Sequence, residues 1–174
     1  MVELNTIKNI EKEFDSSLRL TLLKFVMLFN VFEHNELKNE IGNKQNLSEL
    51  SKKYNEIKKI DKKIIKDFLD FFTIRYIKNG ELTDDFNNLF RDFEKCDDEI
   101  SLLKSYTGKI DDYQNLMFLS LRISYRFRDN LYHGNKVLST LSENKECFEK
   151  INVFLFSVLK QLHDKEDVNY EQTI

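Results

Sequence analysis

The sequence predicts an all-α protein, and three observations support this class. The 174-residue chain has no proline and only four glycines, so it contains few residues that interrupt helices. Its hydrophobic content of 41% and charged content of 33% are typical of a folded globular chain. Several segments repeat apolar residues at steps of three and four, which is the spacing of one helix face. We expect a single domain over residues 1–163, followed by a polar, flexible tail over residues 164–174.

Helices are expected from the N-terminus onward. The first long helix is predicted over residues 16–40, with Asp15 or Ser16 as its N-cap. Its core-facing apolar residues are Leu18, Leu22, Phe25, Phe29 and Phe32. Leu23 and Val26 widen this apolar face, so the helix is expected to be well buried. A short helix is predicted to follow over residues 48–57.

The middle of the chain is expected to hold three further helices. Asp61 is a candidate N-cap for the first, which Asn79-Gly80 would close as a glycine C-cap. Thr83 would cap the second, which reaches Phe93, and the third begins near residue 97.

The C-terminal part is predicted to hold the remaining two long helices. Asp111 or Asp112 would cap a helix that runs to about Tyr132. A loop containing Ser139 and Ser142 would follow, and the last helix would span residues 144–163. The expected fold is therefore an antiparallel helical bundle with four long helices and short accessory helices.

Composition narrows the classes of function. The net charge of −3 means that any nucleic-acid binding must come from a local basic patch. Cys96 and Cys147 are isolated and lack metal-ligand spacing, so we expect reduced thiols, a cytoplasmic protein, and no metal or cofactor. No 18-residue apolar run and no signal-peptide pattern is present, so no membrane association is expected.

The segment of residues 122–136 concentrates groups that bind phosphate and transfer protons. At about 100° per residue, one sector of the helix holds a polar stripe of Arg122, Arg126, Asp129, Asn130 and His133. A neighbouring arc holds apolar residues that would pack into the bundle. We therefore expect the helix to present the polar stripe on a face beside its buried face. Arg128 lies off this stripe, at the border of the apolar arc.

The six residues from Arg128 to His133 resemble the signature of the HEPN superfamily. That signature is an arginine and a histidine separated by four to six residues, often with a polar residue directly after the arginine. Here the polar residue is Asp129. The continuation His133-Gly134-Asn135-Lys136 and the aromatic, asparagine-containing segment of residues 27–32 are also similar to such domains.

The resemblance implies a metal-independent RNA endonuclease that works as a homodimer, with one composite site between two motif helices. Arg128 would stabilise the phosphoryl charge, His133 would act on the ribose 2′-hydroxyl, and Asp129 would be the positioned polar group. Auxiliary contacts to RNA would come from Arg122, Arg126, Asn130, Tyr132 and Lys136. A toxin–antitoxin or antiviral defence role is implied, with an antitoxin or sensor protein as a further partner.

Alternatives remain open at this point. Arg126 also fits the widest spacing to His133, and the helical wheel favours it over Arg128. The domain would alternatively be catalytically silent and bind RNA or a protein. In a purely structural reading, Arg128 pairs with Asp129, and His133 caps the helix end. Some family members carry a modified tyrosine two residues after the histidine, where this chain has Asn135.

Overall fold

The computed structural model describes residues 15–38, 44–57, 60–90, 96–109, 111–132 and 138–163. The described residues are almost entirely helical, which confirms the all-α class. The helices are α2 (Ser16–Glu36), α3 (Lys44–Ile57), α4 (Lys62–Tyr76), α5 (Asp84–Phe90), α6 (Asp97–Ser105), α7 (Tyr113–Tyr132), α8 (Leu138–Glu143) and α9 (Lys145–His163). The predicted tail of residues 164–174 lies outside the described residues.

Aspartates cap three of these helices, as the sequence predicts. Asp15 accepts a hydrogen bond from the backbone N–H of Leu18 at 2.5 Å. Asp61 accepts one from the N–H of Lys63 at 2.8 Å. Asp112 accepts one from an N–H of the first turn of α7 at 3.2 Å. Each carboxylate satisfies a donor that the start of a helix leaves without an intrahelical partner.

A two-stranded hairpin replaces the predicted C-cap after α4. The strands β1 (Ile77–Lys78) and β2 (Glu81–Leu82) pair antiparallel around Asn79-Gly80. Both turn residues have positive φ, 54° and 80°. Asn-Gly with positive φ at both positions is typical of the tight turn that joins two strands, so the C-cap prediction is wrong. The hydroxyl of Thr83 donates to the carbonyl oxygen of Arg75 at 3.0 Å, and its own carbonyl accepts from the N–H of Asn87 at 3.2 Å, so Thr83 is the residue from which α5 starts.

Three other element boundaries differ from the predictions. The first helix ends at Glu36: Leu37 is its C-cap, with its N–H still bonded to the carbonyl of Glu33 at 3.2 Å, and Lys38 then leaves the helical path with a φ of 50°. Helix α3 begins at Lys44 rather than at residue 48. Residues 138–143, predicted as a loop, form α8 and bury Leu141. Serine content suggested that loop, but the segment contains neither proline nor glycine to prevent a helix.

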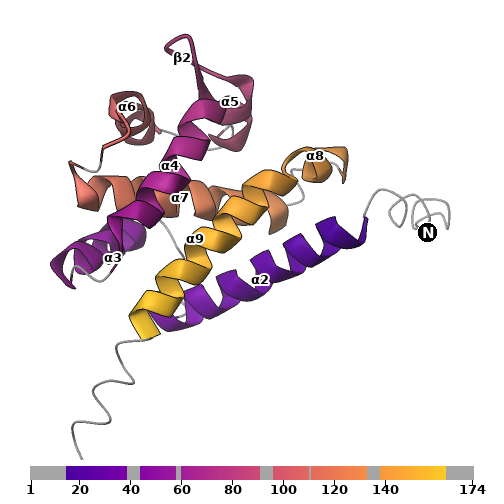
Figure 1. Ribbon diagram of the computed structural model, residues 1–174, viewed down its shortest axis with the longest axis horizontal. Helices are drawn as coiled ribbons and strands as arrows, with labels where there is room; N and C mark the ends of the chain where they lie inside the picture. The colour runs from indigo at the N-terminus through magenta and orange to yellow at the C-terminus, as the bar shows by residue number, and fades with distance from the viewer. Residues whose placement is uncertain are drawn as a thin grey trace, which may run out of the picture.

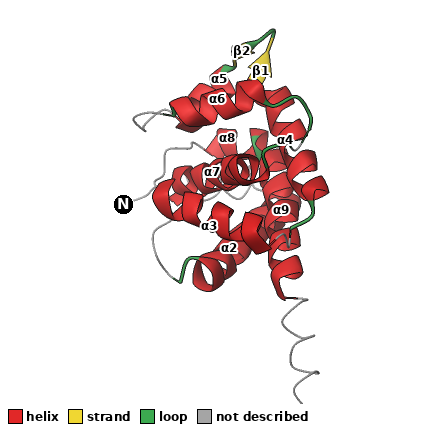
Figure 2. Cartoon of the chain, turned by 90° about the vertical axis from the view of Figure 1, so that its left-hand side faces the viewer, coloured by secondary structure: helices red, strands yellow, loops and turns green. Residues whose placement is uncertain are grey.

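Helix α7 crosses the middle of the molecule (Figures 1 and 2). Helix α2 lies on one side of it, and the hairpin and α5 lie on the other. Helices α2 and α9 run parallel, since Asn152 donates to the carbonyl of Thr21 at 2.9 Å and His163 lies 3.1 Å from Asn35 further along both helices. Helix α4 runs antiparallel to α9, because the start of α4 meets Gln161 near the end of α9. The predicted antiparallel packing therefore holds for α4 with α9 but not for α2 with α9.

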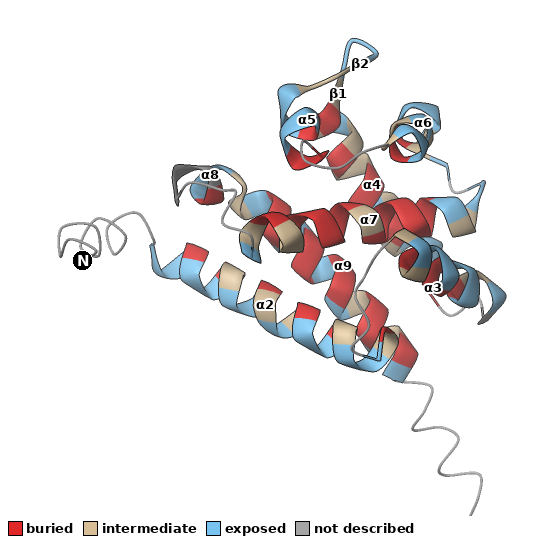
Figure 3. Ribbon diagram, turned by 180° about the vertical axis from the view of Figure 1, so that it is seen from behind, coloured by how far each residue is buried: buried red, intermediate tan, exposed pale blue. Residues whose placement is uncertain are grey.

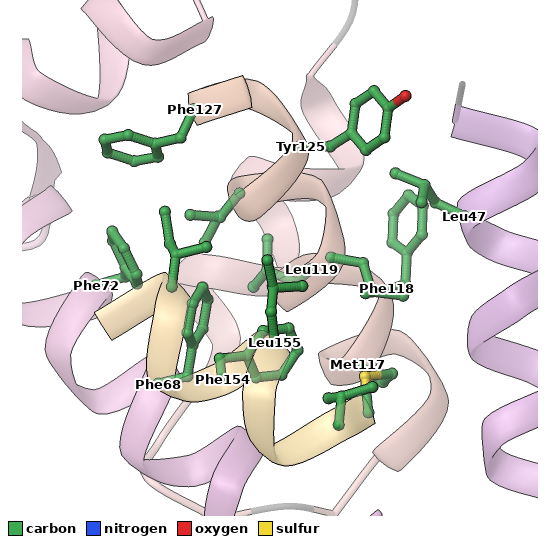
Figure 4. Close-up of a cluster of buried hydrophobic side chains, with 14 of the residues drawn as sticks. Leu47, Phe68, Phe72, Met117, Phe118, Leu119, Tyr125, Phe127, Phe154 and Leu155 are labelled. Carbon is green, nitrogen blue, oxygen red and sulfur yellow. The ribbon is translucent and has the colours of Figure 1, made fainter. Parts of the chain in front are cut away.

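The core is continuous and rich in aromatic rings. Most residues of α7 are buried, and the helix is red along much of its length in Figure 3. Phe127 of α7 lies between α4 and α9, with its ring centre 5.9 Å from that of Phe72 and 5.4 Å from that of Phe148. Figure 4 shows Phe127, Phe72, Phe68 and Phe154 in this cluster. Burying these large rings supplies much of the apolar surface that holds α7 in place.

Helix α2 also has a second apolar face, which is exposed. Leu20, Leu23, Met27 and Val31 are 52%, 56%, 60% and 46% exposed, and we call them the apolar stripe. Their spacing of three, four and four residues places them opposite the core-facing phenylalanines. The prediction that Leu23 helps to bury this helix is therefore wrong.

Candidate functional site

The described part of the site joins the C-terminal end of α7 to α2. The guanidinium of Arg128 lies 3.2 Å from the carboxylate of Glu33 and 3.3 Å from that of Asp129. The hydroxyl of Tyr125 donates to Glu33 at 2.5 Å. We call these residues, together with Tyr132, the Arg128 cluster. The structure thus brings Arg128, Asp129 and Tyr132 together. The pairing of Arg128 with Asp129 is also what the purely structural alternative expects.

Two tyrosine rings flank Arg128. Its guanidinium carbon lies 5.3 Å from the ring centre of Tyr125 and 4.9 Å from that of Tyr132, distances suited to cation–π attraction. Burial alone lowers the pKa of Arg128, but Tyr125, Glu33 and Asp129 outweigh it and raise that pKa. The side chain keeps 26% of its surface exposed, so it is a fixed cation at the protein surface.

Arg126 and Asn130 do not form the presented polar stripe that the sequence predicts. Arg126 is 1% exposed, and its guanidinium donates to the carbonyl of Leu89 at 3.5 Å. The amide of Asn130 donates to the same carbonyl at 3.1 Å. Helix α5 covers this part of α7, which a helical wheel does not show. Both residues tie α5 to α7, and a phosphate cannot reach Arg126 in this conformation.

Arg122 is also held inside the protein. Its Nε donates to the carboxylate of Glu99 at 2.7 Å, and its side chain is only 11% exposed. Glu99 is fully buried, with Lys44 at 3.7 Å as a second cation. The contact joins α6 to α7. In this structure Arg122 therefore forms a structural ion pair with Glu99 instead of the predicted auxiliary contact to RNA.

The remaining predicted site residues, His133 and Lys136, lie outside the described residues, as does Asn135. Helix α7 ends at Tyr132, directly before His133 in the sequence. The roles assigned to His133 and Lys136 stay predictions.

No family model matches the chain. No curated protein and no solved structure matches it either. The resemblance of residues 128–133 to the HEPN signature therefore stays a prediction from the sequence.

Glu33 contacts both Arg128 and Tyr125, although it was not predicted to belong to the site. A weak signal is present in the sequence. Glu33 follows the core residue Phe32, so it lies at the edge of the buried face of α2, where a carboxylate has a charged partner more often than on a solvated face. The partner itself was not predictable, because Arg128 lies on another helix, 95 residues further along the chain.

No three side chains among the described His, Cys, Asp and Glu residues gather closely enough to hold a metal ion. No helix in the described part of the chain is long and apolar enough to cross a membrane. The described site itself consists of a cation flanked by carboxylates and phenols.

Proposed function

We propose that this protein is a metal-independent endoribonuclease of HEPN type. The observation that carries the proposal is the setting of Arg128. This arginine is partly exposed at the C-terminal end of α7, is held by charge and by rings, and stands five residues before His133. Arginine's planar fork of donors suits the oxygens of a phosphodiester.

The proposed reaction is attack by the ribose 2′-hydroxyl on the adjacent phosphorus. His133 takes the hydroxyl proton, and proton transfer of this kind contributes about 10²–10⁴-fold to rate. Arg128 stabilises the charge that grows on the phosphoryl oxygens. The bond to the 5′-oxygen then breaks, leaving a cyclic phosphate and a 5′-hydroxyl. DNA lacks the attacking hydroxyl, so this route does not cut it.

Asp129 is the proposed positioning residue. Its carboxylate lies 3.3 Å from Arg128 and 3.6 Å from Arg126, so it already fixes the guanidinium of Arg128. Being four residues before His133, it is also spaced to orient that imidazole if the helical path continues.

The proposed oligomeric state, location and biological role follow from the resemblance to the HEPN superfamily. Two copies would form a homodimer with their motif segments facing each other, in an HEPN-like bundle of four long helices. The protein would act in the cytoplasm, in a toxin–antitoxin or antiviral defence role, and an antitoxin or sensor protein would control it.

An RNA cleavage assay in EDTA tests the proposed function. Wild-type protein is expected to cut unstructured RNA but not the same strand with 2′-deoxyribose. Arg128→Ala and His133→Ala are each expected to lower the rate by about 10²-fold or more. Arg75→Ala is the matched control, since Arg75 is also partly buried and pairs with Asp85 at 2.8 Å on other helices. Cleavage that survives His133→Ala, or that needs a metal ion, contradicts the mechanism.

A second candidate function is a catalytically silent protein-interaction module. The apolar stripe of α2 favours it, because exposed apolar side chains grouped on one face commonly mark contact surfaces. The same assay separates the two candidates. RNA that stays intact under all conditions, with wild-type and Arg128→Ala proteins indistinguishable, supports the module and removes the nuclease.

A further inference from the structure

Glu33 and Asp129 surround Arg128 with more negative charge than it carries. Both carboxylates lie within 3.3 Å of the guanidinium, and each of their side chains is only 18% exposed. The second oxygen of Glu33 also accepts from Arg128, at 3.4 Å. Arg126 offsets part of this charge, at 3.6 Å from Asp129. A phosphate that approaches Arg128 therefore meets positions already taken by carboxylate oxygens.

The two carboxylates are held differently. Asp129 is the next residue on α7 and also contacts Arg126, so it moves with Arg128. Glu33 belongs to α2, and its described partners besides Arg128 include the hydroxyl of Tyr125. The Glu33 side chain can turn away, or α2 can separate slightly from the end of α7. Either movement exposes the guanidinium nitrogen that Glu33 contacts, and α7 stays folded.

We propose that Glu33 is a built-in competitor for the RNA phosphate at Arg128. A phosphodiester must displace the Glu33 carboxylate before it can bind the guanidinium. This inference rests on the proposed function and adds a form of regulation to it. The contact between α2 and α7 sets the affinity of Arg128 for a phosphate. Competition of this kind lowers the affinity for anions while keeping Arg128 in place for them.

The test measures phosphate binding at Arg128 itself. Inorganic phosphate is titrated into the full-length protein at constant ionic strength, and the Nε–Hε NMR signal of Arg128 is followed. Arg128→Lys identifies that signal by its loss. Glu33→Gln is expected to lower the dissociation constant by about three- to tenfold, the effect of one nearby charge in a partly solvated site. The glutamine still accepts the hydrogen bond from Tyr125.

Glu36→Gln is the matched control. Glu36 lies one turn further along α2 and accepts a hydrogen bond from Tyr54 at 2.8 Å, with Lys53 at 3.7 Å. Removing its charge is expected to leave the phosphate affinity at Arg128 unchanged. If circular dichroism shows that Glu33→Gln is misfolded, Glu33→Asp replaces it, because the shorter side chain draws the carboxylate back and shifts the affinity in the same direction.

Two results overturn the proposal: equal or weaker phosphate binding by the Glu33 variant, or an equal gain in Glu36→Gln. RNA cleavage in EDTA is measured on the same samples. Tighter phosphate binding without cleavage keeps the competition and removes the nuclease. Cleavage with unchanged phosphate affinity keeps the nuclease and makes Glu33 a structural residue only.

Discussion

At the scale of single residues, the arginines of α7 divide by the partners that they find. Arg122 and Arg126 point inward, to Glu99 and to the carbonyl of Leu89, whereas Arg128 stays at the surface. A buried ion pair contributes little net stability, but removing one partner leaves the other charge without compensation. Arginine is thus a structural residue at positions 122 and 126 of α7 and a candidate-site residue at position 128.

Arg122→Ala is expected to lower the free energy of unfolding by about 3 kcal/mol, because the buried carboxylate of Glu99 loses its hydrogen-bonded partner and keeps Lys44, at 3.7 Å, as a counter-charge. Urea denaturation measures this change. Asp98→Ala is the control, since Asp98 is 70% exposed in its pair with Lys44, and its loss should cost less than about 1 kcal/mol. An Arg122→Ala protein of full stability that loses RNA binding would instead make Arg122 an RNA contact.

Tyr113 provides a pH-dependent prediction. Burial raises its pKa to about 12, and its hydroxyl donates a hydrogen bond to the carbonyl of Ile60 at 3.2 Å. A group whose pKa is higher in the folded state stabilises the fold below its unfolded pKa, here about 10, and this contribution is lost as pH rises toward 12. Denaturation from pH 9 to 11 should show a smaller loss of stability in Tyr113→Phe than in wild type. Parallel curves would contradict the assignment.

At the scale of elements, α2 combines a buried aromatic face with the exposed apolar stripe. Alternation at steps of three and four predicts a helix equally well from either face, so the existence of α2 was predictable. Which apolar face meets the core was not, because the choice depends on where α7 and α9 lie. The hairpin at Asn79-Gly80 shows a different limit: its turn sequence was visible, but strands of two residues are too short to show an alternating pattern.

Neighbouring positions on α2 should therefore respond very differently to truncation. Phe25 is fully buried and its ring centre lies 4.9 Å from that of Phe148, so Phe25→Ala is expected to cost about 3–5 kcal/mol of unfolding free energy. Met27→Ala should change it by less than about 0.5 kcal/mol. Chemical denaturation of both variants checks the contrast. A large loss in Met27→Ala would mean that the apolar stripe is covered in solution.

At the scale of the whole molecule, the described helices share one continuous core. Phe127 links α7 to α4 and α9 through its contacts with Phe72 and Phe148. A core without internal boundaries favours unfolding as a single cooperative unit. Far-UV circular dichroism and tyrosine fluorescence should therefore report the same urea midpoint. Separate midpoints would indicate that part of the helical structure unfolds independently.

Sequence reasoning predicted the helical class, the capping aspartates and the segment that holds Arg128 and Asp129. These features depend on local pattern and cap chemistry, which the chain carries within a few residues. It did not predict the burial of Arg126 or the contact of Glu33 with Arg128. Both depend on which helix covers which face, and that is decided by packing between segments far apart in the chain.

The apolar stripe also affects how the purified protein behaves in concentrated salt. Sulfate is excluded from protein surfaces and thereby strengthens the tendency of exposed apolar side chains to associate. With four large side chains of α2 in contact with solvent, precipitation is expected to begin at a lower ammonium sulfate concentration than for a Leu23→Lys, Met27→Lys double variant. Fractionation at graded saturation would compare the two directly.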